Sequence, residues 1–265
     1  MKIAALQLLY MGMSSTRLYK YVRNAHKQGV KLLLLGEYML NPFFKELQSV
    51  TPAMIREQSD HQVAILKELS KEYNMTIVAP LIVIRKKEPY KCIVKIAPTS
   101  TAYYDQQLLI NYKHWNEERF FSNMIKPLQS PLIFTIENIK FAVMGGFELH
   151  FDELWNYVSN KSVDVVLLPS IATFDSNERW KDLIKMRSFT KNCYVLRANR
   201  VGEYIEDEHS WKFYGNSLLT SPDGIIESEL GDVEELMVVE VNHSEVVESR
   251  RAWGFREALN RRITT

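Results

Sequence analysis

The stretch FAVMGGFELHF at residues 141–151 joins a strand-like run to a glycine pair and then to polar residues. Residues 141–144 are all apolar, as is typical of a strand that is covered on both faces. The glycines at 145–146 end that run, and Glu148 and His150 follow them. Polar side chains just beyond a buried strand are frequent site residues, because the sheet holds them rigidly. The stretch therefore predicts an α/β fold with a site at this strand end.

Other apolar runs alternate with helical patterns along the chain. Residues 30–36, VKLLLLG, are nearly continuous in apolar residues, and residues 52–73 predict a helix because Thr51 is a candidate N-cap and Pro52 takes the first helical position. We also predict helices at 15–28 and 176–191, and strands at 2–9, 75–84, 91–97, 101–110, 132–136, 140–145, 164–168, 193–198, 216–220 and 236–241. Many strands with only about four helices predict two mixed sheets with helices outside, a layered α/β sandwich. No linker, repeat or shift in composition interrupts the chain, so we expect one domain over residues 1–265.

Composition limits the class of partner. The chain of 265 residues carries 33 basic and 32 acidic residues, a formal net charge of +1. This balance gives no electrostatic reason to expect binding to a nucleic acid or an anionic membrane. No apolar stretch reaches the roughly 18–20 residues that span a bilayer, and no signal-peptide cleavage pattern follows the N-terminal run. With only two cysteines, the sequence predicts a cytoplasmic protein.

Three strand-like runs end on residues that could form one site. Glu37 follows four leucines, Lys113 follows the segment YDQQLLINY, and the glycine pair with Glu148 follows FAVM. Taken singly, a glutamate or lysine at such a place is usually solvent-exposed, and a glycine pair usually makes a turn. Their joint occurrence after different strands favours a shared site.

These motifs, in this order, resemble those of the nitrilase superfamily of carbon–nitrogen hydrolases, nearly from end to end of the chain. The segments that carry the resemblance are KIAALQLL, LLLLGEYML, NYKHW, EERFF, VVLLPS, RWKDLIKMRSFTKNCYVLRANRVG, GNSLLTSPDG and ESRRAWGFREALNRR. The resemblance implies a nitrilase-like αββα sandwich, two mixed sheets flanked by helices, and no metal or organic cofactor.

The resemblance also implies a mechanism. In the family, a cysteine thiolate attacks a nitrile or amide carbon, a glutamate acts as general base and a lysine stabilises the tetrahedral intermediate. Carried over by motif, Glu37 would be the base and Lys113 the oxyanion stabiliser. Glu118 would be the additional catalytic acid, although its neighbour Glu117 fits the same motif and is otherwise expected to contact the substrate.

The family's nucleophile position is occupied by Gly146. The family elbow reads cysteine, aromatic, acid, leucine, arginine, phenylalanine, and the matching segment here, residues 146–151, reads GFELHF. Phe147 and Glu148 match the aromatic and the acid, and we expect both to bind substrate. Glycine has no side chain with which to attack a carbon atom.

The rest of the sequence offers no evident replacement nucleophile. Cys92 and Cys193 lie in β-type runs and are interpreted as core residues, since free cysteine packs as a small hydrophobe. Ser170 and Ser217 are candidates in principle, but the chain has no G-x-S-x-G elbow. The six histidines show no metal-ligand spacing, and no glycine-rich phosphate loop is present.

Two interpretations of function remain open at this stage. The first is an enzyme that hydrolyses non-peptide C–N bonds of a small amide or a related amide- or nitrile-like compound. The alternative is a catalytically inactive protein that binds a small molecule in a pocket enlarged by the missing cysteine side chain, or that serves as a regulatory or structural subunit. The resemblance further implies a homodimer or larger homo-oligomer, in which the tail at 250–265 could dock on a neighbour.

Overall fold

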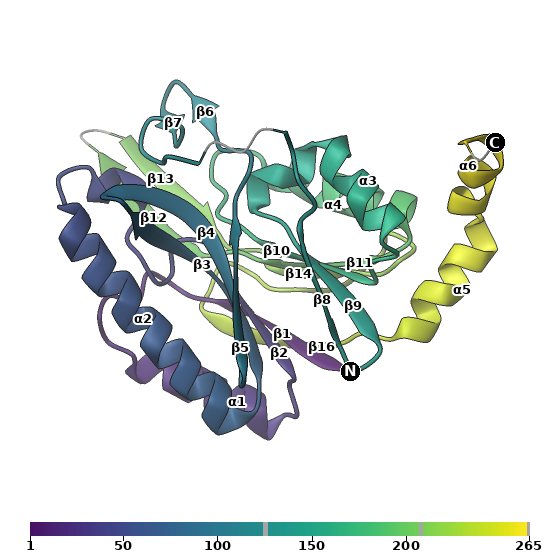
Figure 1. The fold of residues 1–265 in the computed structure, drawn as a ribbon, viewed down its shortest axis with the longest axis horizontal. Coiled ribbons are helices and arrows are strands. Elements are labelled where there is room, and N and C mark those ends of the chain that lie inside the picture. The colour runs from purple at the N-terminus through teal and green to yellow at the C-terminus, as the bar shows by residue number, and fades with distance from the viewer. Residues whose placement is uncertain (124–126, 207–208, 264–265) are drawn as a thin grey trace.

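Two six-stranded sheets face each other in the computed structural model, with helices on both outer sides (Figure 1). The structure describes residues 1–123, 127–206 and 209–263. Each sheet contains parallel and antiparallel strand pairs. The prediction of an αββα sandwich with two mixed sheets is therefore confirmed.

The first sheet has the strand order β16-β1-β2-β3-β4-β5. Strands β1, β2 and β3 are parallel, and β3, β4 and β5 form an antiparallel meander. Their bounds are Lys2–Gln7 for β1, Leu32–Leu35 for β2, Thr76–Arg85 for β3, Glu88–Ala97 for β4, Ser100–Asp105 for β5 and Glu235–Glu240 for β16.

The second sheet has the order β15-β14-β11-β10-β9-β8. Its central strands β9, β10 and β11 are parallel, and the outer pairs are antiparallel. The bounds are Leu132–Ile136 for β8, Ile139–Val143 for β9, Val165–Pro169 for β10, Tyr194–Ala198 for β11, Leu218–Thr220 for β14 and Ile226–Glu229 for β15.

Helices cover the outer faces, and short elements close one end of the sandwich. The helices are α1 Thr16–Lys27, α2 Pro52–Tyr73, α3 Asp152–Asn160, α4 Asn177–Lys191, α5 His243–Trp253 and α6 Phe255–Ile263. The short elements are the 3₁₀ turns η1 Phe44–Leu47 and η2 Gly146–His150, the hairpin β6 Asn111–Tyr112 with β7 Trp115–Asn116, and the hairpin β12 Val201–Glu206 with β13 His209–Tyr214.

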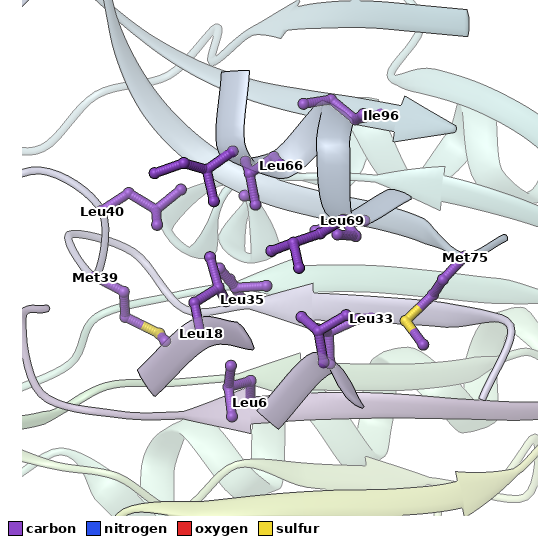
Figure 2. Packing of buried hydrophobic residues seen from close by; sticks show 14 of the residues in the cluster. Leu6, Leu18, Leu33, Leu35, Met39, Leu40, Leu66, Leu69, Met75 and Ile96 are labelled. Atoms are coloured by element: carbon purple, nitrogen blue, oxygen red, sulfur yellow. The ribbon is translucent and has the colours of Figure 1, made fainter. Parts of the chain in front are cut away.

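The apolar core forms layers between these elements. In β2, Leu33 and Leu35 point to the side of α1 and α2 (Figure 2), whereas Leu32 and Leu34 point into the layer between the sheets. Side chains alternate along a strand, so a strand covered on both faces needs apolar residues at every position. This explains the run of four leucines.

The carboxyl ends of β2 and β10 meet across the two sheets. The backbone N–H of Glu37 donates to the carbonyl oxygen of Ser170 at 3.1 Å. Gly36 lies so close to the backbone of Asn199 that an added Cβ would stand 2.9 Å from its carbonyl carbon. Glycine permits this approach, and the residue that follows it is thereby held at the junction of the sheets.

The C-terminal helices α5 and α6 extend away from the sandwich (Figure 1). The rings of Trp253 and Phe255 both pack edge-to-face on Phe189 of α4, at centroid distances of 4.8 and 5.3 Å. The tail at 250–265 is thus helical as far as Ile263, and its last two residues lie outside the described part of the chain. Its docking on a neighbouring subunit remains a prediction.

Candidate active site

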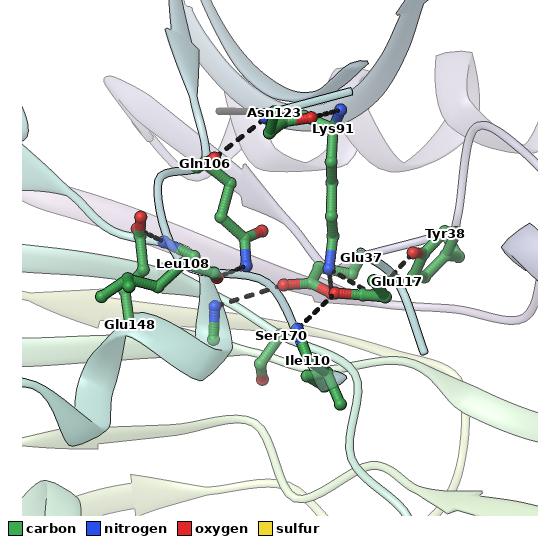
Figure 3. Close-up of polar contacts among 12 residues, drawn as sticks. Glu37, Tyr38, Lys91, Gln106, Leu108, Ile110, Glu117, Asn123, Glu148 and Ser170 are labelled. Carbon is green, nitrogen blue, oxygen red and sulfur yellow. Dashed lines mark hydrogen bonds and ion pairs between the residues drawn. The ribbon is translucent and has the colours of Figure 1, made fainter. Parts of the chain in front are cut away.

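Glu37 lies buried where the two sheets meet, directly after β2 and Gly36. Its side chain is 3% exposed. Its Oε1 accepts a hydrogen bond from the backbone N–H of Gly146 at 3.2 Å, and its Oε2 accepts one from Lys91 Nζ at 2.9 Å (Figure 3). The glutamate and the glycine elbow that the sequence predicted to share a site are therefore neighbours in space.

The cation at this centre is Lys91, from β4. Its Nζ bridges two carboxylates, because it also donates to Glu117 Oε1 at 2.7 Å. The same Glu117 oxygen accepts the hydroxyl hydrogen of Tyr38 at 2.8 Å. The Asn123 side chain bonds to both the N–H and the C=O of Lys91, which fixes the backbone from which the ammonium group projects. We call Glu37, Lys91 and Glu117 the buried triad.

Burial and charge act against each other in the triad. Burial raises the pKa of Glu37, the Lys91 charge lowers it, and the Glu117 charge raises it again, so that its pKa ends above the usual range. For Lys91, burial lowers the pKa, but the two carboxylates outweigh burial and raise the pKa above its ordinary value. Lys91 is therefore an ammonium ion that holds two carboxylates together.

The structure does not bring Lys113 or Glu118 into this centre. Both side chains are exposed beside the β6–β7 hairpin, and Glu118 accepts a hydrogen bond from Asn111 at 2.7 Å. Lys91 and Glu117 occupy the interior positions that the sequence reasoning gave to Lys113 and Glu118. One signal could have found Lys91: it shares a strand face with Ile93, which packs between the sheets.

Gly146 begins η2 and packs directly against the end of β10. A Cβ on Gly146 would lie 2.7 Å from Ser170 Cβ and 3.1 Å from Ser170 Cα. Contacts this short require one of the residues to shift. The space of a side chain at position 146 is therefore taken by Ser170, and the enlarged pocket expected from the missing cysteine side chain is not present.

Glu148 is a buried anchor of the elbow. Its Oε1 accepts hydrogen bonds from Tyr104 Oη at 2.9 Å and from the N–H of Gln107 at 2.7 Å, and its Oε2 accepts one from the N–H of Gly145 at 2.6 Å. Burial outweighs these donors and raises the pKa of Glu148 to about 7. All of these partners belong to the protein itself, so Glu148 fixes η2 against the end of β5.

A pocket with aromatic and aliphatic walls opens next to this centre. Its volume is about 380 Å³. It is lined by Ile110, Tyr112, Trp115, Phe147, His150, Ile171, Ala172, Thr173, Phe174, Ser176, Arg179, Trp180 and Leu183. We call it the aromatic pocket. Phe147, which was expected to contact a substrate, is one of its walls.

The buried triad does not line the aromatic pocket. The cavity that Glu37 and Lys91 do line has a volume of about 10 Å³. That is at or below the space of a single water molecule. A substrate carbon could reach Glu37 only after neighbouring side chains moved.

Neither cysteine has the surroundings of a nucleophile. Cys92 Sγ donates to Asp105 Oδ1 at 3.0 Å, and burial raises the pKa of this thiol far above its usual range. Cys193 packs among the apolar residues beneath α3 and α4, and burial raises its pKa to about 12. Because the thiolate is the reactive form, both thiols are inert near neutral pH.

Ser170 also lacks an activating base. Its Oγ accepts a hydrogen bond from Arg197 Nε at 3.0 Å and lies 3.5 Å from the carbonyl oxygen of Ala198. A serine nucleophile needs a group that removes its proton, and a guanidinium cannot do this. Within the described ranges, no set of three or more histidine, cysteine, aspartate or glutamate side chains is placed to hold a metal ion. Nor is any helix in the described part of the chain long and apolar enough to cross a membrane.

Comparisons with known proteins agree with this geometry. The chain matches the family described as carbon–nitrogen hydrolase over residues 15–251. It is 22% identical over 267 residues to the N-carbamoylputrescine amidase of Oryza sativa subsp. japonica. That alignment covers 90% of this chain and 84% of the amidase. It is 26% identical to the deaminated glutathione amidase of Synechocystis over 106 residues, only 40% of this chain and 38% of the relative's length.

Solved structures share the fold. A carbon–nitrogen hydrolase from Helicobacter pylori G27 superposes with a TM-score of 0.85 at 21% identity, covering 97% of this chain and 95% of that one. An amidase from Nesterenkonia sp. AN1 superposes with a TM-score of 0.77 at 19% identity, covering 97% of this chain and 96% of the amidase. That amidase was solved as a mutant in complex with butyramide.

The chain therefore belongs to the carbon–nitrogen hydrolase family. Several of the proteins that it resembles are named as amidases.

Proposed function

We propose that this protein binds a small molecule on the amidase scaffold and does not hydrolyse amides at ordinary enzyme rates. The observation that carries the proposal is the packing of Ser170 against Gly146. The elbow and Glu37 still meet, but the residue at the elbow has no nucleophilic atom, and the space for one is filled. Loss of a nucleophile typically costs several orders of magnitude in rate, because such residues act as a unit.

The aromatic pocket is the ligand site in this proposal. Its volume of about 380 Å³ lies within the range of small-molecule sites, and apolar walls with a few polar groups are typical of them. The relatives support ligands of amide, amine or carboxylate type, since their names describe amidases. The domain organisation, the homo-oligomeric state and the roles of Glu37, Glu117 and Phe147 in binding remain predictions.

A slow hydrolysis by water is the second candidate, and the buried triad favours it. Glu37 and Lys91 lie within hydrogen-bond distance of each other, and Glu37 also lies beside the elbow, as a base and a charge stabiliser would. Glu37→Gln would abolish such a residual rate, whereas Lys113→Met, at an exposed position, would leave it unchanged.

The test is ammonia release from a panel of small amides, carbamoyl compounds and nitriles. We expect turnover far below about 1 per second, the low end of ordinary enzyme rates. Turnover at ordinary rates would overturn the proposal. The variant Gly146→Cys/Ser170→Gly, which supplies a thiol together with the space for it, is run alongside. Ammonia release by this variant alone would support the interpretation that the parent chain lacks only the nucleophile.

A further inference from the structure

Arg197 is a buried cation with two unused donor groups. It lies in β11, its side chain is 0% exposed, and its Nε donates to Ser170 Oγ at 3.0 Å. In the described part of the chain, Nη1 and Nη2 have no hydrogen-bond partner. Nearly all buried polar groups in proteins are satisfied, and an unpaired buried charge is strongly unfavourable. The two Nη groups therefore need a hydrogen-bond acceptor. An anion is the best one because it also neutralises the buried charge.

Two aromatic rings enclose this guanidinium. Its central carbon lies 5.0 Å from the ring centroid of Trp180 and 5.7 Å from that of Tyr214. Trp180 is a wall of the aromatic pocket, and Tyr214 lines a second hollow of about 330 Å³ beside Phe174. Arg197 thus lies directly behind the inner wall of the aromatic pocket. Burial lowers the pKa of Arg197, and the neighbouring Tyr214 hydroxyl and the Glu229 charge offset this only in part, so the guanidinium has no full counter-charge.

A second unused donor lies in the pocket wall itself. Trp115 is 2% exposed, and its Nε1–H has no hydrogen-bond partner among the described residues. The described lining residues include no aspartate or glutamate, whereas Arg179 at the rim carries a positive charge. The pocket therefore carries positive charge at its rim, and unused buried donors lie in and behind its walls.

We propose that the aromatic pocket binds a carboxylate with an apolar, ring-sized body, and that Arg197 recognises its charge. The inference rests on the proposed ligand-binding function and names the class of ligand. A carboxylate matches the planar guanidinium in a two-point contact, and the indole N–H of Trp115 supplies a further donor. Since both Nη atoms are covered, the carboxylate reaches them when the Trp180 ring moves aside. Arg197 is then the specificity-determining residue of the site.

The probes are phenylacetate and its uncharged analogue phenylacetamide. Their rings are the same, so the difference between them isolates the carboxylate. Titration calorimetry and thermal shift on the full chain should show phenylacetate binding about tenfold or more tighter, as expected when a charge-assisted contact is made in a buried site. Equal binding of the two probes, or tighter binding of the amide, would overturn the proposal.

Arg197→Met should remove the preference for the carboxylate. Because the substitution replaces an unpaired buried charge with an apolar group of similar length, the variant should fold and melt no lower than the parent. Arg119→Met is the matched control, an exposed arginine that does not line the pocket, and should change the preference less than threefold. A preference that survives Arg197→Met would contradict the assignment.

A second variant keeps the proposal testable if Arg197→Met does not fold. Trp115→Phe retains a ring but removes the N–H, and it should weaken phenylacetate more than phenylacetamide, because the N–H bond to a carboxylate is charge-assisted. Equal weakening of both probes would count against the proposal. The proposed function and the inference about Arg197 fail in different ways. Release of ammonia from phenylacetamide at ordinary rates would contradict the proposed function, whereas binding without a carboxylate preference would contradict only the inference about Arg197.

Discussion

The backbone N–H of Gly146 donates to Glu37 Oε1 at 3.2 Å, so the elbow after β9 and the glutamate after β2 meet although residue 146 has no side chain. The contact is made by main chain on one side. It therefore needs only the N–H of residue 146 and no side chain there. The position of Glu37 at the elbow is therefore independent of whether residue 146 is a nucleophile.

Gly146→Cys alone should destabilise the protein. The new Cβ would lie 2.7 Å from Ser170 Cβ, and overpacking of this kind typically lowers the free energy of unfolding by about 1–3 kcal/mol. Adding Ser170→Gly should relieve the overpacking, at the cost of the hydrogen bond from Arg197 Nε to Ser170 Oγ, so the two changes should not be additive. Urea unfolding of the parent, both single variants and the double variant measures the coupling. A cysteine variant as stable as the parent would mean that Ser170 yields without cost.

Lys91→Met should be one of the most damaging single changes in the chain. It leaves the buried carboxylates of Glu37 and Glu117 without their cation, which typically costs about 3–5 kcal/mol. Lys113→Met, at an exposed position, should cost less than about 0.5 kcal/mol. The comparison of their urea midpoints tests which lysine belongs to the centre, and equal effects would refute the assignment of Lys91. Adding Glu117→Gln should recover part of the loss.

Glu148 should make stability depend on pH. Its pKa is raised from 4.5 to about 7 in the folded protein, so between these values the folded state holds a proton that the unfolded state has released. The contribution of Glu148 to the free energy of unfolding is therefore largest below about pH 4.5 and falls as the pH rises towards 7, by at most about 1.4 kcal/mol per pH unit.

The pH effect is measured by urea unfolding at pH 5, 6, 7 and 8 in the parent and in Glu148→Gln. The glutamine cannot titrate, so its slope against pH should be the flatter of the two. Only the slopes are compared, since glutamine also changes the hydrogen bonds to Gly145 and Gln107. Parallel slopes would show that Glu148 does not titrate in this range.

Both thiols should resist modification in the folded protein. Cys92 and Cys193 are buried, and burial raises the pKa of each. An aromatic disulfide reagent at pH 8 should therefore react with neither thiol in buffer and with two per chain in urea. Rapid reaction of one thiol in buffer would reveal a candidate nucleophile that its surroundings do not indicate.

The fold could be predicted from local patterns, because a strand that is buried on both faces needs apolar residues at nearly every position. The expected strand at 132–136 matches β8, and the expected helix at 52–73 matches α2, where Thr51 Oγ1 accepts from the N–H of Met54 at 3.4 Å. The β12–β13 hairpin was missed. Its strands alternate buried residues such as Trp211 and Phe213 with exposed ones, so they lack the continuous apolar runs on which the prediction depended.

The site was only partly predictable. Glu37 and Gly146 each come just after an apolar run, so the sequence alone indicates their place at a strand end. The choice between Lys91 and Lys113 depends on which of them the second sheet covers. Lys91 and Glu117 are 26 residues apart and meet only in the folded chain. The choice between the neighbouring glutamates had a local signal: Glu117 lies two residues after the buried Trp115 and shares its side, which leaves Glu118 exposed.

The contact between Ser170 and Gly146 also bears on evolutionary reversibility. Restoring a cysteine at position 146 by itself would put its Cβ 2.7 Å from Ser170 Cβ. A thiol at position 146 is therefore accommodated best when position 170 changes as well, and that second change brings no catalytic gain on its own. Under the proposed function, this dependence on two positions would preserve the non-catalytic state even while Glu37 and Lys91 persist.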